Sequence, residues 1–272
     1  MRPSTRPTPT TCISSREAGE AGTSSPAPST STTPRSAESA ARPVAGRARS
    51  PARGIMTPSG PARDELAARL RLIVITDRDL ARPREVTEVV GEALRAGAPA
   101  IQLREKTLPP RDTLPLARRL RADTRAAGAL FFVNDRPDLA LAVGADGVHL
   151  GPDDLPVAAA RRIAPPPFLI GYSTDDPDAA RAAVADGAHY IGCGAVFPTS
   201  TKSDAGRAVG LRGLARVVAA VDAPVVAIGG IDAARAPGVF RVGAGCAAVS
   251  AVMAAADPGR AVHSILRAAA EG

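Results

Sequence analysis

Short apolar runs alternate with longer stretches rich in Ala, Arg and Leu along most of this 272-residue chain, and this alternation constrains the fold more than any other feature. Apolar runs of this length are typical of buried strands, and the longer stretches are typical of amphipathic helices. Because strands that alternate with helices form parallel sheets, eight such units in about 200 residues predict a closed (β/α)8 barrel.

The predicted strands are residues 72–76, 100–104, 130–134, 147–150, 168–172, 190–195, 225–228 and 247–251. The predicted helices are residues 84–96, 111–127, a short turn after 137, a helix from about 155, then 177–186, 211–220, 233–240 and 258–270. The alternative is an open doubly wound sheet. Such a sheet would favour a glycine-rich turn after the first strand, where Thr76, Asp77 and Arg78 stand instead.

The first 60 residues have a different composition from the rest of the chain. They hold nine of the 26 prolines, twenty Ser or Thr residues and no aromatic residue. Such a segment cannot bury enough apolar surface to offset the entropy lost on ordering. The sequence therefore predicts a disordered extension over residues 1–62 and a single barrel domain over residues 63–272.

Most of the net positive charge lies in this N-terminal extension. Its eight Arg and three Glu residues give +5 of the total formal charge of +7, so the barrel itself is only weakly basic. We therefore expect no nucleic-acid partner. No run of apolar residues is long enough to span a membrane, and Cys12, Cys193 and Cys246 do not form a metal-ligand pattern. The second and third cysteines are expected to be small buried hydrophobes, in a chain located in the reducing cytoplasm.

The rarest residue types mark candidate site positions. The chain has 32 Arg residues but only two Lys residues, Lys106 and Lys202, and single copies of Gln102 and Asn134. A bias toward Arg leaves Lys mainly where a compact ammonium group is required, because a planar guanidinium cannot make the same point contact. All four residues lie at strand ends or in loops of the predicted barrel, where barrel enzymes place their chemistry.

One predicted strand end carries three polar side chains on one face. Gln102, Arg104 and Lys106 alternate with Leu103 and Glu105, which face the other way. A row of polar side chains facing inward needs a polar ligand, and Arg and Lys suit phosphate groups. A solvated strand end with salt bridges is the alternative.

Carboxylates follow the next two strands. Asp135 follows the third predicted strand and Asp154 follows the fourth. Both are therefore predicted to share one Mg2+ ion with substrate phosphate. Helix N-capping is the alternative for both residues, and it is the preferred interpretation for Asp153.

Further candidates follow the later strands. A long polar loop carries Thr199, Thr201 and Lys202, a glycine pair includes Gly230, and Ser250 ends the eighth predicted strand. Glycine allows backbone N–H groups to approach phosphate, and long loops in compact domains are usually functional. His149 is interpreted as a structural strand-end residue, with general base as the alternative.

Six segments in this order resemble the thiamine-phosphate synthase family: QLREK, NDRPDLALAVGADGVHLGPDDLP, IGYST, YIGCGAVFPTSTK, VVAIGGI and VSAV. The resemblance covers roughly residues 70–255. It implies a (β/α)8 barrel enzyme that joins 4-amino-2-methyl-5-hydroxymethylpyrimidine diphosphate to 4-methyl-5-(2-phosphoethyl)thiazole. The products so implied are thiamine monophosphate and free diphosphate, and the cofactor is Mg2+. The partners so implied are these two small phosphorylated molecules.

The resemblance also implies roles for individual residues. The pyrimidine-diphosphate contacts are Gln102, Leu103, Arg104, Glu105, Lys106, Asn134, Ser173 and Lys202, of which Arg104, Lys106, Ser173 and Lys202 are assigned to catalysis. The Mg2+ ligands are Asp135 and Asp154. The thiazole-phosphate contacts are Thr199, Ser200, Thr201, Gly230, Val249 and Ser250. Two departures stand out: Tyr172 replaces a small aliphatic residue and is expected to reshape the pocket wall, and Pro152 and Asp153 replace the usual Gln-Glu pair.

Three other functions stay open at this point. A thiazole tautomerase-like relative shares the barrel but lacks the full set of cations and metal ligands. The second open function is that of another phosphosugar barrel. The third is that of a non-catalytic sensor of a phosphorylated ligand, and a degenerate metal site would favour it. The sequence is compatible with a homo-oligomer and does not define its size.

We predict that a chain starting at Met56 melts and turns over like the full chain, because no segment before it has the periodicity to join a closed barrel. Translation is expected to begin at this methionine. An organellar transit peptide is the alternative, since such peptides are rich in Arg and Ser and poor in acidic residues, although prolines interrupt every candidate helix. A large loss of melting temperature or of activity in the shortened chain would contradict the prediction.

Overall fold

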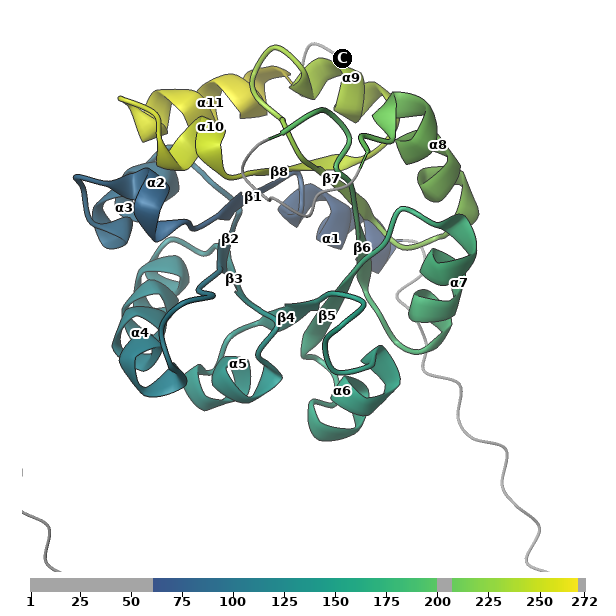
Figure 1. Cartoon of the computed structure of the whole chain (residues 1–272), viewed down its shortest axis with the longest axis horizontal. Helices are drawn as coiled ribbons and strands as arrows, with labels where there is room; N and C mark the ends of the chain where they lie inside the picture. The colour runs from purple at the N-terminus through teal and green to yellow at the C-terminus, as the bar shows by residue number, and fades with distance from the viewer. Residues whose placement is uncertain (1–60, 200–206, 269–272) are drawn as a thin grey trace, which may run out of the picture. The chain divides into compact units, whose positions relative to one another are not determined.

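Eight parallel strands close into a barrel in the computed structural model, which describes residues 61–199 and 207–268 (Figure 1). Each strand pairs with the next one along the chain, and the eighth pairs with the first. The strands are β1 (Leu72–Ile75), β2 (Ala100–Leu103), β3 (Leu130–Asn134), β4 (Gly147–Leu150), β5 (Leu169–Ser173), β6 (Tyr190–Cys193), β7 (Val225–Ile228) and β8 (Gly245–Ala248). The predicted (β/α)8 barrel is confirmed, and an open sheet is excluded.

Helices surround this barrel on its outer face, except for the first one, which lies across one end of the barrel (Figure 1). They are α1 (Pro61–Arg69), α2 (Arg78–Ala81), α3 (Val86–Arg95), α4 (Pro110–Ala126), α5 (Pro137–Val143), α6 (Val157–Ile163), α7 (Pro177–Ala185), α8 (Gly210–Ala220), α9 (Ala236–Arg241), α10 (Ser250–Met253) and α11 (Pro258–Ala268). Local capping fixes several starts: the Asp176 carboxylate accepts hydrogen bonds from the first backbone N–H groups of α7. None of the described helices is long and apolar enough to cross a bilayer.

Three features differ from the sequence prediction. α1, which begins at Pro61 before the first strand, was not predicted. α2 was not predicted; Asp77 caps it by accepting from two backbone N–H groups. β8 ends before Val249, and Ser250 begins α10 instead of ending a strand. Periodicity cannot place that last boundary, because nearly every residue nearby is small or apolar.

The predicted disorder of residues 1–60 lies outside the described residues, as does the end of the predicted helix beyond residue 268. The same holds for residues 200–206, which contain three of the predicted site residues. The other predicted boundaries lie within three residues of the observed ones.

Two large rings and several glycines fill the barrel interior. Tyr190 and Phe132 meet edge to face, with ring centroids 5.4 Å apart and an interplanar angle of 66°. A Cβ atom added to Gly171 would lie 2.2 Å from the Tyr190 ring, and one on Gly147 would lie 2.9 Å from the Phe132 ring. The glycines therefore provide the volume that the two rings occupy.

The segment before β1 closes one end of the barrel. Leu66 of α1 and Leu70, directly after it, are buried in one cluster with Ile73, Leu130 and Tyr190. Because α1 precedes β1, this cluster lies at the N-terminal end of the strands. The strand ends at the opposite side are thus left to form a site.

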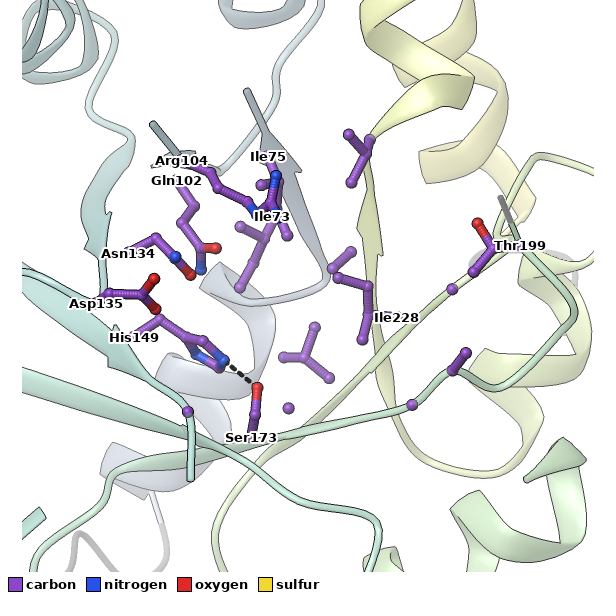
Figure 2. Close-up of a pocket in the computed structure, with 18 of the residues that line it drawn as sticks. Ile73, Ile75, Gln102, Arg104, Asn134, Asp135, His149, Ser173, Thr199 and Ile228 are labelled. Atoms are coloured by element: carbon purple, nitrogen blue, oxygen red, sulfur yellow. Dashed lines mark hydrogen bonds between the residues drawn. The ribbon is translucent and has the colours of Figure 1, made fainter. Parts of the chain in front are cut away.

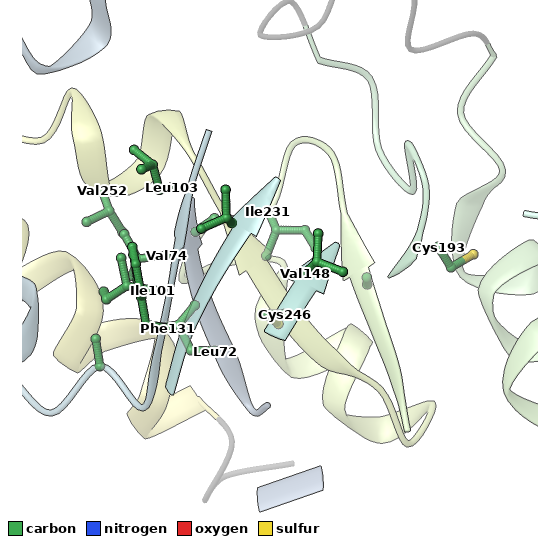
Figure 3. Close-up of a cluster of buried hydrophobic side chains, with 14 of the residues drawn as sticks. Leu72, Val74, Ile101, Leu103, Phe131, Val148, Cys193, Ile231, Cys246 and Val252 are labelled. Carbon is green, nitrogen blue, oxygen red and sulfur yellow. The ribbon is translucent and has the colours of Figure 1, made fainter. Parts of the chain in front are cut away.

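A second apolar core lies between the strands and the helices (Figure 3). Alternate residues of the strands, such as Leu72 and Val74 of β1, point into it and away from the barrel interior. Cys193 and Cys246 are free and buried in this core. This confirms the prediction that they are small buried hydrophobes.

We predict that Gly171→Ala lowers the free energy of unfolding by about 1–3 kcal/mol or more, because the new methyl group overlaps the Tyr190 ring. Urea unfolding followed by circular dichroism measures the change. Gly91→Ala in α3 is the matched control, since its Cβ would meet nothing closer than 3.5 Å and alanine favours helix. A Gly171→Ala variant as stable as this control would show that the ring moves aside at no cost.

Candidate active site

A cavity of about 430 Å³ opens at the C-terminal ends of the strands (Figure 2). Its two halves differ in chemistry. Polar side chains from β2, β3, β4 and β5 line one side, and the apolar side chains of Ile73, Ile75, Val226 and Ile228 line the other. The cavity therefore fits a ligand with a charged part and an apolar part.

The polar side begins with β2 and the residues after it. Gln102, Arg104 and Lys106 all line the cavity, as their shared face predicted. The Thr76 hydroxyl accepts from the Arg104 backbone N–H at 3.0 Å, which fixes the chain where it leaves the strand. Within the described residues no hydrogen bond or ion pair engages the Arg104 guanidinium group, so it is available to a ligand.

Leu103 and Glu105 do not line the cavity. Leu103 is buried in the core beneath the helices. The Glu105 carboxylate accepts hydrogen bonds from the Thr107 side chain and from the backbone N–H groups of Thr107 and Leu108, and it pairs with Arg78 at 2.9 Å. Burial acts to raise the pKa of Glu105, but these bonds outweigh it and lower the pKa to about 2. The side chain thus braces the loop after β2, and contact of either residue with substrate stays a prediction.

Asp135 turns the chain sharply after β3. Its φ of 63° places it in the left-handed region, where Asp is one of the few side chains tolerated. Its backbone N–H donates to the carbonyl of His149 at 2.8 Å, and its carboxylate lies 2.8 Å from Lys106 Nζ. N-capping, the alternative role for Asp135, is wrong, because the residue at the start of α5 is Arg136 and its side chain makes no cap bond.

Asp154 lies beside Asp135. Its carboxylate accepts from the Gly151 backbone N–H at 2.6 Å, which closes a tight turn after β4. Burial raises the pKa of Asp154; the Gly151 bond opposes the rise, and the neighbouring Asp135 carboxyl adds to it. Two carboxyl groups and one ammonium group therefore converge at one edge of the cavity.

The helix after this turn does not use an aspartate as its cap. α6 is preceded by Pro156, which makes no side-chain cap bond, so the N-capping roles predicted for Asp153 and considered for Asp154 are wrong. Asp153 is exposed at the rim of the cavity. Among the described residues no group of three or more His, Cys, Asp or Glu side chains is arranged to hold a metal ion.

A hydrogen-bonded group lies deeper in the cavity (Figure 2). His149 Nε2 is 2.7 Å from the Ser173 hydroxyl, and His149 Nδ1 is 2.9 Å from the Tyr190 hydroxyl. Burial lowers the pKa of His149 to about 4, with Asp135 opposing the change, so the imidazole is neutral near pH 7. Sequence reasoning missed Tyr190. The signal that could have indicated it is an aromatic residue on β6 that faces a glycine, Gly171, on the neighbouring β5.

The opposite rim comes from the loops after β6, β7 and β8. Thr199, Gly230, Val249 and Ser250 all line the cavity there. A Cβ atom on Gly230 would lie 2.6 Å from the carbonyl oxygen of Pro198, so only glycine fits at this position, where φ is also 63°. Ser200, Thr201 and Lys202, predicted for this rim, lie outside the described residues.

Arg235 links two of these loops and was also missed by sequence reasoning. Its guanidinium group donates to the Gly230 carbonyl at 2.6 Å and stacks over the Phe197 ring at 5.3 Å from the ring centroid. The expectation that Tyr172 reshapes the pocket wall is wrong. Tyr172 alternates with Gly171 and Ser173 on β5 and packs against the outer core instead.

Comparison with known proteins identifies the family. The family model described as thiamine monophosphate synthase matches residues 72–253. The chain belongs to this family. A thiamine-phosphate synthase of Moorella thermoacetica is 48% identical over 195 residues, covering 71% of this chain and 93% of the relative. One of Methanoculleus marisnigri is 50% identical over 195 residues, covering 71% and 92%.

A solved structure agrees with this assignment. Thiamine phosphate pyrophosphorylase from Pyrococcus furiosus superposes with a TM-score of 0.70 at 47% sequence identity. The match covers 76% of this chain and 98% of that one, so it includes the whole barrel.

We predict that Glu105→Gln lowers the free energy of unfolding at pH 7 and that the difference from wild type shrinks at pH 3. Folding lowers the pKa of Glu105 from 4.5 to about 2, so its charged form stabilises the fold above pH 4.5 and this contribution disappears as pH falls toward 2. Urea unfolding at both pH values measures the effect. Glu65→Gln on the exposed side of α1 is the control, expected to change stability by under about 0.5 kcal/mol at either pH. A pH-independent difference for Glu105→Gln would contradict this role.

Proposed function

We propose that the chain is an alkyl transferase that makes thiamine monophosphate. It joins 4-amino-2-methyl-5-hydroxymethylpyrimidine diphosphate to 4-methyl-5-(2-phosphoethyl)thiazole and releases diphosphate. The observation that carries the proposal is the cavity of this family member, with cations and carboxylates on one side and an apolar wall on the other. Relatives of about half-identical sequence named thiamine-phosphate synthase support it, and they do not favour a tautomerase or a sensor.

The polar side would hold the pyrimidine diphosphate. Arg104 offers a planar fork and Lys106 a point charge for the diphosphate oxygens. Gln102, Asn134 and Ser173 line the cavity beside them and would contact the pyrimidine ring. Lys202 lies outside the described residues. Its contact with the same substrate is therefore proposed from the family resemblance alone.

The carboxylates of Asp135 and Asp154 fit a Mg2+ ion. Mg2+ in nucleotide and diphosphate sites usually takes one or two carboxylates, with water and phosphate oxygens as the other ligands. Burial raises the pKa of Asp154, and the neighbouring Asp135 carboxyl adds to the rise, so a bound cation would favour the charged forms of both groups. When bound, the ion would neutralise charge on the diphosphate.

The reaction proposed here is a dissociative substitution. The bond between the pyrimidine methylene carbon and the diphosphate oxygen breaks, and that oxygen keeps the electron pair. The thiazole ring nitrogen then donates its lone pair to the methylene carbon and forms the new C–N bond. Arg104 and Lys106 would stabilise the charge that develops on the leaving diphosphate. A ring nitrogen needs no general base to become a nucleophile, which agrees with a neutral, fully engaged His149.

The opposite rim would hold the thiazole phosphate. Thr199 and Ser250 offer hydroxyl groups there, and Gly230 allows close approach to the backbone. Val249 supplies an apolar contact for the thiazole ring, and Ser200 and Thr201 are proposed for the same phosphate by resemblance. We further propose a cytoplasmic location, supported by the free state of Cys193 and Cys246.

We predict that Asp135→Ala and Asp154→Ala each lower kcat/KM by about 100-fold or more, because each removes a carboxylate that would position the ion. Formation of thiamine monophosphate from the two substrates across a Mg2+ titration measures the loss, and circular dichroism checks the fold. Asp138→Ala is the matched control, because Asp138 pairs with Arg136 at the surface of α5 and does not line the cavity. Near-wild-type turnover by either variant would remove the metal assignment. Absence of any product from the wild-type chain would remove the proposed function.

A further inference from the structure

Two loops meet at the rim of the cavity that lies opposite the charged residues, and Arg235 connects them. One loop follows β6 and carries Phe197, and the other follows β7 and carries Gly230. The Arg235 guanidinium group donates to the Gly230 carbonyl oxygen at 2.6 Å and lies over the Phe197 ring, 5.3 Å from its centroid. Arg235 does not itself line the cavity. Its side chain therefore contacts rim residues without being part of the cavity wall.

The backbone that carries Arg235 is held in a short turn. Asp232 Oδ1 accepts hydrogen bonds from the backbone N–H groups of Ala234 and Arg235, at 3.1 and 3.0 Å. Arg235 occupies the N-cap position of α9, yet its side chain makes no cap bond. The side chain returns instead to Gly230, five residues earlier in the chain. The turn thus directs the guanidinium group to one carbonyl oxygen.

Gly230 is closely surrounded by both loops. A Cβ atom added to it would lie 2.6 Å from the Pro198 carbonyl oxygen, 3.0 Å from Phe197 Cβ and 3.2 Å from a guanidinium nitrogen of Arg235. Beside it, the Phe197 N–H donates to the Gly229 carbonyl at 3.1 Å. These contacts leave the Gly230 backbone little room to turn.

The bond from Arg235 sets the direction of a neighbouring donor. In a planar trans peptide the C=O and N–H groups point in opposite directions. The Gly230 carbonyl points toward Arg235, so the Ile231 N–H of the same peptide points away from it. Within residues 61–199 and 207–268 no group accepts a hydrogen bond from this N–H, and both Gly230 and Ile231 line the cavity. A cation at the carbonyl end strengthens the N–H as a donor, because hydrogen bonds in series polarise one another.

We propose that Arg235 is a positioning residue for the phosphate group of the second substrate. It fixes the peptide that joins Gly230 to Ile231, so that the N–H of this peptide donates to the phosphate. The Gly230 carbonyl needs a donor and the Phe197 ring needs a flat cation, and arginine supplies both in one side chain. The inference rests on the proposed function, because the thiazole phosphate is assigned to this rim there.

Steady-state kinetics with each substrate varied in turn test this role. We expect Arg235→Met to raise the KM for the thiazole phosphate about tenfold, which corresponds to about 1.4 kcal/mol, and to leave the KM for the pyrimidine diphosphate unchanged. Arg241→Met is the matched control. Arg241 is also exposed and donates to a backbone carbonyl, that of Pro237 at 3.3 Å, but it lies away from the cavity. Both KM values should stay unchanged in this control.

Arg235→Lys separates positioning from attraction between charges. Lysine keeps the positive charge and a donor, but it loses the flat face that lies over Phe197. Arg235 is exposed, so water and salt screen its charge. We expect Arg235→Lys to raise the KM for the thiazole phosphate about threefold, the effect of one lost cation–π contact. A wild-type KM in Arg235→Lys would assign any effect of Arg235→Met to charge alone and overturn the positioning role, and this holds even if Arg235→Met fails to fold.

The two KM values also separate this role from a general loss of structure. A smaller amount of folded enzyme lowers the apparent kcat and leaves both KM values unchanged. An unchanged KM for the thiazole phosphate in Arg235→Met, with product still formed by the wild type, overturns the inference and keeps the proposed function. An equal rise in both KM values overturns it as well, because the change is then not confined to this rim. No product from the wild-type chain removes the proposed function, and the inference with it.

Discussion

Close packing inside a narrow barrel is the constraint on which the rest of this structure depends. The Tyr190 ring fits only because Gly171 on the neighbouring strand has no side chain. That position brings its hydroxyl group to His149, and His149 in turn reaches Ser173 in the cavity. A steric requirement of the barrel interior thereby determines the polar groups that a ligand meets at the strand ends.

Opposite charges at the cavity edge complement this packed floor. Lys106 is half exposed and pairs with Asp135, while Asp154 is held by a backbone N–H group of its own turn. These groups sit on short turns directly after three consecutive strands, so rigid strands set their spacing. A phosphorylated ligand would exchange contacts with charges that are already positioned, which reduces the reorganisation needed on binding.

Much of the fold follows from local sequence patterns, and some features depend on contacts between distant residues. The eight strands and most helices were predictable because apolar runs and helical periodicity are local properties. The convergence of Gln102, Arg104, Lys106, Asp135 and Asp154 followed from one rule, that strand ends meet at one face of a barrel.

Other features could not be predicted in this way. Tyr190 resembles an ordinary strand residue until Gly171 is known to face it, and Arg235 resembles a surface residue until Gly230 and Phe197 are brought beside it. Asp153 resembles a helix cap because Asp is common there, yet the helix begins three residues later than a cap at that position would require.

Leu66 and Leu70 close the base of the barrel, so ligands reach the cavity only from the end where the strands terminate. In the part of the chain that the structure describes, the cavity is a well with a packed floor and an open mouth. Two reactants must therefore enter, and the products must leave, through the same opening.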